Sequence, residues 1–145
     1  MELLQIKEIK MKNEFAPYEP SLALKELGFN EPCLAKYSID IVGETIPHFR
    51  YNNRISQAES IDERVWFNHN LDKEYIWSAP LYQQAFRWFR EKYQIDSWIY
   101  PNLNGLYSVS NIRRGVGLGK VSEYQTYEEA ELACLIKLIE IVKNK

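Results

Sequence analysis

The chain has 145 residues, of which 46% are hydrophobic and 26% charged, and this composition excludes an intrinsically disordered chain. Its 18 basic and 20 acidic residues give a net charge of −2, which disfavours a protein that wraps duplex DNA or lies on a membrane surface. No stretch reaches the ~18 apolar residues of a membrane span, and no secretory signal is recognisable, so we expect one cytoplasmic domain with no membrane contact.

The first 27 residues contain one clear helix signal. Residues 1–16 mix apolar and charged side chains without a clean period, which indicates a loosely packed N-terminal arm. A short helix is predicted over 19–27, because Pro20 suits a first helical turn. Gly28 is placed for the left-handed conformation that ends many helices, and Phe29 would then fold back on Leu24.

Two strands and a less legible segment follow. Alternating apolar residues predict strands over 36–42 and 46–51. Residues 54–78 resist assignment, and the apolar triplets 65–67 and 75–77 fit either short strands or buried loop anchors.

The next helix is predicted over 81–93. Ser78 is a candidate cap and Pro80 opens the first turn. At 100° per residue, the large apolar side chains fall on one arc of the helix, and we expect the following four to be buried against a sheet: Leu81, Ala85, Trp88 and Phe89.

The C-terminal third reads as a hairpin followed by a helix. Strands are predicted at 98–100 and 106–112 around an Asn104-Gly105 turn, with a last strand near 120–121. Thr126 and Glu129 match the capping box that begins a helix, which we expect to extend to about residue 143. These elements together predict an α+β fold: an antiparallel sheet of about four to five strands with three helices mainly on one face.

No motif for catalysis or metal binding is present. The glycines at 115, 117 and 119 have neither the spacing of a P-loop nor that of a dinucleotide-binding loop. Cys33 and Cys134 lie far apart in the sequence and do not form a zinc-type pair, and Cys134 has the apolar neighbours of a small buried residue. We therefore expect no cofactor, no metal and no catalytic residue of a recognisable type.

Three stretches carry a resemblance: residues 18–29, 79–93 and 126–135. Together they resemble a family of small proteins from phage and prophage genes of gut anaerobic bacteria, to which no activity is assigned. All three stretches coincide with predicted helices. The resemblance implies an accessory protein of a phage or mobile element, and it transfers no functional residue.

Two functions from different classes fit the sequence. The first is a non-enzymatic binding or adaptor module for a protein or single-stranded nucleic acid. Arginine and tyrosine are enriched at interfaces, and the candidate contact residues are Tyr107, Arg113, Arg114, Lys120 and Tyr124. The alternative is a small enzyme or small-molecule binder whose site is assembled from scattered residues, namely His48, Arg50, Asp62 and His69.

The C-terminal helix also suggests self-association. Its apolar residues spread over more than roughly 200° of the helix, which is wider than one sheet can cover. Either the other helices cover its flanks or a second copy of the chain does, forming a two-fold dimer.

Overall fold

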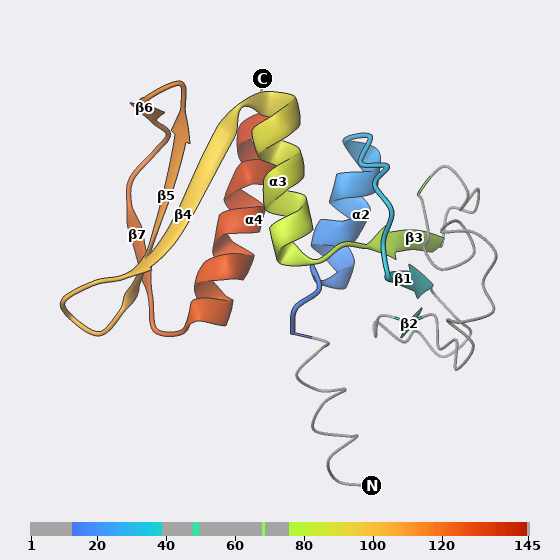
Figure 1. The fold of residues 1–145 in the computed structure, drawn as a ribbon, viewed down its shortest axis with the longest axis horizontal. Coiled ribbons are helices and arrows are strands. Elements are labelled where there is room, and N and C mark those ends of the chain that lie inside the picture. The colour runs from blue at the N-terminus through green and yellow to red at the C-terminus, as the bar shows by residue number, and fades with distance from the viewer. Residues whose placement is uncertain (1–12, 39–47, 50–67, 69–75, 145) are drawn as a thin grey trace, which may run out of the picture. The chain divides into compact units, whose positions relative to one another are not determined.

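The computed structural model describes residues 13–38, 48–49, 68 and 76–144. The elements within these ranges are α2 (Tyr18–Glu26), β1 (Ala35–Ser38), β2 (His48–Phe49), β3 (Ile76–Ala79), α3 (Tyr82–Tyr93), β4 (Ile95–Pro101), β5 (Tyr107–Arg113), β6 (Val116–Gly117), β7 (Ser122–Tyr124) and α4 (Tyr127–Lys143) (Figure 1). The α+β class and the antiparallel pairing are confirmed. The strands form two sheets where the sequence suggested one, and the chain separates into two compact units, residues 1–81 and 82–145.

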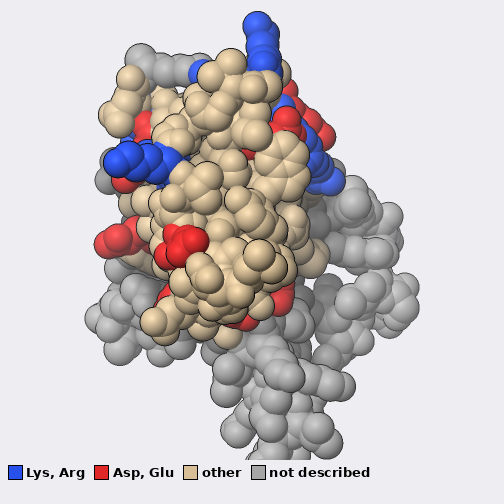
Figure 2. Space-filling model, turned by 90° about the vertical axis from the view of Figure 1, so that its left-hand side faces the viewer, with Lys and Arg blue, Asp and Glu red and all other residues tan. Residues whose placement is uncertain are grey.

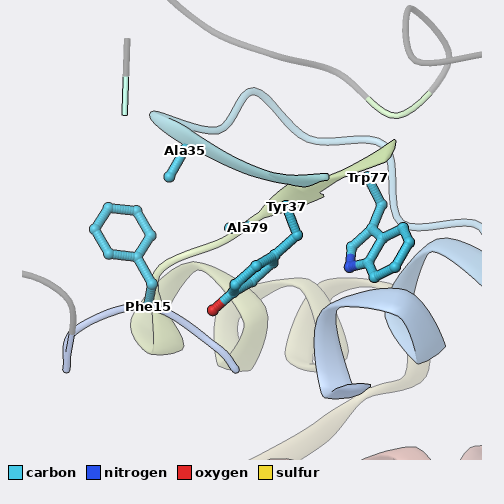
Figure 3. Packing of buried hydrophobic residues seen from close by; sticks show 5 residues of the cluster. All are labelled: Phe15, Ala35, Tyr37, Trp77 and Ala79. Carbon is cyan, nitrogen blue, oxygen red and sulfur yellow. The ribbon is translucent and has the colours of Figure 1, made fainter. Parts of the chain in front are cut away.

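The first unit contains a three-stranded sheet in the order β2-β1-β3. The register of β1 on β3 places Tyr37 opposite Trp77 and Ala35 opposite Ala79. These four residues and Phe15 form a buried cluster (Figure 3). Tyr37 donates a hydrogen bond from its hydroxyl to the Ala16 carbonyl at 2.9 Å, so the polar tip of this buried ring is satisfied.

Helix α2 ends as the sequence predicts. Gly28 has φ of 90°, and its N–H bonds the Lys25 carbonyl at 3.0 Å. The Phe29 N–H bonds the Leu24 carbonyl at 2.9 Å, which completes a Schellman motif, and both side chains are buried. Trp77 donates from its indole to the Tyr18 carbonyl in the first turn of α2, at 3.2 Å.

Asn68 connects two segments of this unit. Its Nδ2 donates to the Phe29 carbonyl at 2.7 Å, and its Oδ1 accepts from the Ser78 N–H at 2.9 Å. The prediction that Ser78 caps the following helix is therefore wrong: Ser78 is a buried residue of β3, and α3 begins four residues later. A serine before an apolar run resembles a cap in sequence, but here its backbone belongs to a sheet.

Parts of the sequence prediction fall on residues that the structure does not describe, and there they stay predictions. The strands predicted over 36–42 and 46–51 correspond to β1 and β2 only at 35–38 and 48–49, and their remaining residues lie outside the described residues. The same holds for 65–67 and for most of the arm 1–16, whereas the triplet 75–77 overlaps β3.

The second unit is built on β5. One edge of β5 pairs along its whole length with β4, and the other edge pairs with β7 at residues 107–109 and with β6 at residues 112–113. The strands predicted at 98–100 and 106–112 are thus confirmed with altered ends, and the last strand lies at 122–124 instead of 120–121. Helices α3 and α4 lie on one side of this sheet (Figure 1).

The buried face of α3 matches its predicted apolar arc. Trp88 is 7% exposed, and its ring packs edge-on against Phe89, with ring centroids 5.1 Å apart. Ala85 and Phe89 are fully buried. Leu81 is only half-buried, because it precedes the helix and forms an isolated bridge with Phe15.

Helix α4 begins with the predicted capping box. Glu129 donates its N–H to Thr126 Oγ1 at 3.1 Å, and its carboxylate accepts from the Thr126 N–H at 3.4 Å. The helix buries Cys134, Leu135 and Leu138 among others, and α3 packs against it. Its wide apolar surface is thus shared between the sheet and α3, while Ile136 stays 42% exposed. Among the described helices, none is long and apolar enough to cross a bilayer.

Asn102 organises the turn between β4 and β5. Its Oδ1 accepts from the N–H groups of Asn104 and Leu106 at 3.0 and 3.1 Å. Its Nδ2 donates to Ser108 Oγ at 3.2 Å and to the Glu123 carboxylate at 3.1 Å. Gly105 has φ of 74°, but Asn104 does not have positive φ, and the connection runs from 102 to 106. The hairpin predicted from Asn104-Gly105 therefore forms through a longer loop than a two-residue turn.

Candidate functional site

The five residues predicted as a contact surface do not all come together. Tyr107 and Tyr124 are cross-strand partners at one end of β5, and the Tyr107 ring packs edge-on against Tyr127 of α4 at 5.7 Å. Arg113 lies at the other end of β5, six residues and about 20 Å further along the strand. Lys120 and Tyr124 line the same pocket.

Arg113 is less accessible than the sequence suggests. Its cross-strand partner is Ile95, which is buried, and the side chain is half-buried. The Nε and Nη2 atoms of its guanidinium are buried and have no hydrogen-bond partner among the residues that the structure describes. Arg114, in contrast, is exposed and has φ of 49°. Of the two arginines, only Arg114 presents a fully accessible charge.

A pocket of about 510 Å³ opens between the sheet and α4. Lys120 lines it from the segment between β6 and β7. The sheet wall is made by residues of β5 and β7, namely Val109, Asn111, Ser122 and Tyr124. The helix wall is made by Ala133, Ile136, Lys137 and Glu140. The volume is in the usual range for small-ligand sites, and the lining combines apolar and polar groups.

Asn111 is the most buried polar residue of this pocket, with 6% of its surface exposed. Its Oδ1 accepts hydrogen bonds from Ser97 Oγ at 2.7 Å and from Cys134 Sγ at 3.6 Å. Its Nδ2 group is not among the buried polar atoms without a partner, although the residue as a whole is buried. The amide N–H groups can therefore donate to a molecule in the pocket.

The chemistry of Cys134 is set by the same network. Burial raises the pKa of its thiol from 9.0 to about 11, a hydrogen bond with Ser97 opposes the rise, and the Glu131 carboxylate adds to it. The thiol is therefore protonated at neutral pH and buried, which makes it a poor nucleophile. Its predicted role as a small buried residue is confirmed.

Two exposed lysines, Lys120 and Lys137, line the same pocket. Gly119 has φ of 79°, and a Cβ placed on it would lie 3.3 Å from Lys137 Cε and 3.6 Å from Lys137 Nζ. The Lys137 side chain thus lies against the backbone just before Lys120. Neither lysine forms an ion pair within the described part of the chain, so two positive charges from different elements flank one pocket.

The opposite side of the same sheet carries exposed apolar side chains. Asn111 of β5 faces α4, and its register partner Ser97 does so too. Their neighbours in the alternation, Trp98 and Tyr100, therefore lie on the outer face, where they are 52% and 42% exposed. They pair with Ser110, which is half-buried, and with Ser108, which is buried and accepts a hydrogen bond from Asn102. We call the side of the sheet that carries Trp98, Tyr100 and Ser110 the outer face.

Further exposed apolar residues lie close by in sequence: Leu103 in the turn, Val116 in β6 and Val121 before β7. Of the large hydrophobic residues exposed in the described ranges, most belong to the segment 98–121. Seen from the side of Figure 1 on which this sheet lies, the surface has a broad central area of uncharged residues, with charged side chains mainly toward its margins (Figure 2).

The charged strand residues that alternate onto the outer face, Asp96 and Glu123, are acidic, whereas Lys and Arg side chains appear at the margins of this view (Figure 2). Asp96 is two residues before Trp98 on the same strand and pairs with Ile112. Glu123 pairs with Ser108 and accepts the hydrogen bond from Asn102. By the same alternation, Arg113 lies on the helix side. The outer face therefore combines aromatic rings with negative charge.

The residues of the alternative enzymatic site cannot be assembled. His48 belongs to β2, but only its backbone is described, and Arg50, Asp62 and His69 lie outside the described residues. Within the described ranges, no group of three or more His, Cys, Asp or Glu side chains is arranged to hold a metal ion.

Comparisons with known proteins find no matching family model, no similar curated protein and no similar solved structure. The candidate surfaces therefore rest on the geometry of this chain alone.

Proposed function

We propose that this protein is a non-enzymatic binding module that contacts a protein partner through the outer face. The observation that carries the proposal is the exposure of Trp98 and Tyr100, side by side on an open sheet face. Large aromatic side chains are costly to leave in water and are enriched at the centres of protein interfaces. The resemblance to phage-type proteins fits an accessory adaptor of this kind.

Charge distinguishes a protein partner from nucleic acid. Exposed aromatic rings on a sheet can stack on bases, but a nucleic-acid site also needs positive charge beside the rings. Here Asp96 and Glu123 share the outer face, and Lys120 lines a pocket on the other side. We infer a partner with an apolar centre and basic groups that complement these carboxylates. The same carboxylates disfavour a second copy of this face as the partner.

The test is affinity capture from the native host with matched variants. The double variant Trp98→Ser, Tyr100→Ser removes both rings from the outer face. Leu34→Ser is the control, because Leu34 is 53% exposed and belongs to the first unit. Loss of two central aromatic contacts typically costs 2 kcal/mol or more, which corresponds to at least about thirtyfold weaker binding.

The expected result is a specific protein retained by the parent chain and by Leu34→Ser, lost by the double variant, and insensitive to nuclease. Added salt is expected to weaken binding of the purified partner, because salt screens the attraction between complementary charges. Capture that depends on nucleic acid, or that survives the double variant, contradicts the proposal. Melting temperatures of the variants show whether each remains folded.

Self-association through α4 is a separate proposal. Ile136 is 42% exposed on this helix, although α3 covers another part of its apolar surface. Light scattering at micromolar concentration distinguishes a dimer from a monomer. A dimer that Ile136→Ser dissociates supports the contact, and a monomer mass for the parent chain excludes it.

A further inference from the structure

We infer that the pocket between β5, β7 and α4 binds a carboxylate attached to a short apolar group. This site lies on the helix side of the sheet and is independent of the outer face. The inference rests on three features that meet in the pocket: the amide donor of Asn111, two exposed lysines, and an apolar wall.

The amide donor comes from Asn111, a lining residue of the pocket. Because its Oδ1 is engaged by Ser97 and Cys134, the side chain is held in one orientation. Its Nδ2 group, which is not among the buried polar atoms without a partner, is then free to donate to a bound oxygen. The amide therefore favours a ligand with an oxygen acceptor.

The charge of the ligand is inferred from the lysines of the lining. Lys120 and Lys137 line the pocket from different elements, and Lys137 lies against Gly119. Glu140 is the one acidic residue of the lining. Two positive charges against one negative charge favour an anion, and hydrogen bonds to charged groups are stronger than neutral ones.

The rest of the ligand is expected to be apolar, because Val109, Ala133 and Ile136 supply apolar surface to both walls of the pocket. A small inorganic anion would leave this surface in contact with water. An apolar chain that ends in a carboxylate satisfies both parts of the pocket. A free short-chain acid and the C-terminal residue of a peptide share this chemistry.

The experiment is an NMR titration of the full-length protein with hexanoate, followed through backbone amide resonances. Hexan-1-ol has the same apolar body without the charge, and acetate has the charge without the body. N-acetyl-glycyl-leucine tests the peptide source. Saturable shifts at Asn111, Ser122 and Ile136 with hexanoate, and weaker binding of both hexan-1-ol and acetate, are the expected result.

Lysine variants test whether Lys120 and Lys137 bind the carboxylate. Lys120→Gln with Lys137→Gln is expected to weaken hexanoate binding about fivefold, as loss of two partly exposed ion pairs predicts. Lys143→Gln, on the same helix but outside the pocket lining, is expected to leave it unchanged. Tighter binding of the dipeptide than of hexanoate identifies a peptide as the natural source, and the reverse order identifies a free acid.

Three results overturn the inference: no saturable shift with hexanoate or the dipeptide, equal binding of hexan-1-ol and hexanoate, or an equal effect of Lys143→Gln. The proposed protein-binding function is tested separately, because Trp98→Ser with Tyr100→Ser leaves the pocket lining intact. Hexanoate binding by that variant therefore reports on the pocket alone.

Discussion

The burial of Cys134, which bonds the pocket residue Asn111, can be tested by alkaline titration. Its thiol is fully buried, and burial raises its pKa from 9.0 to about 11. The folded protein thus favours the neutral thiol more than the unfolded chain does. This contribution to stability is complete below pH 9 and is lost as the pH rises through about 11.

The magnitude follows from the two pKa values. The difference between 9.0 and about 11 corresponds to roughly 2–3 kcal/mol of unfolding free energy. Other groups also titrate in this range, including Tyr37, whose pKa burial raises as well. The variant Cys134→Ala keeps all of these groups, so the difference in unfolding free energy between the parent chain and the variant isolates the thiol.

The assay is urea unfolding followed by tryptophan fluorescence at a series of pH values. The stability of the parent chain relative to Cys134→Ala is expected to be constant up to pH 9 and then to fall by roughly 2–3 kcal/mol above it. A difference that stays constant over the whole range refutes the reasoning. It would mean that solvent reaches the thiol in the folded protein.

Three further outcomes test the packing. Trp88→Ala is expected to lower the unfolding free energy by about 3–5 kcal/mol, as aromatic truncations in cores do, and an effect below about 1 kcal/mol in urea unfolding would place Trp88 at the surface. Asn68→Ala leaves two buried backbone groups without a hydrogen-bond partner and is expected to lower the unfolding free energy by about 2–4 kcal/mol. Asn68→Asp keeps the acceptor for the Ser78 N–H and loses the donor to the Phe29 carbonyl, so it tests whether both bonds matter. Arg113→Met keeps the apolar stem and removes two buried donors without partners, so we expect a gain of about 1 kcal/mol in thermal unfolding; a loss would reveal an acceptor on the guanidinium.

The helices were predictable from sequence because their signals are local. Gly28 and the Thr126–Glu129 pair each mark a helix end through contacts within a few residues. The division of the strands into two sheets was not predictable, because pairing of β1 with β3 joins segments about 40 residues apart. Ser78 shows the limit of local signals, since its N–H is bound by Asn68, ten residues earlier.

The site was harder to predict than the fold. Lys120 and Tyr124 were singled out and line the pocket, but their partners on α4 follow no motif in sequence. Asn111 carried no signal, because its importance depends on Ser97 and Cys134, which reach it through strand pairing and helix packing. Trp98 and Tyr100 were recognised as strand residues, and their alternation with Ile99 marks them as sharing one face of the strand.

The hydrogen bonds of Asn102 bear on how this hairpin keeps its register. The Asn102 amide bonds the turn and also Glu123 of β7. One side chain therefore fixes the alignment of β4, β5 and β7. In a sheet, a slip of one residue exchanges the two faces. Without these hydrogen bonds, a hairpin shifted by one residue would turn Trp98 and Tyr100 toward α4 and expose Ser97 and Ile99 to solvent. The hydrogen bonds of this turn therefore determine which side of the sheet is available to a partner.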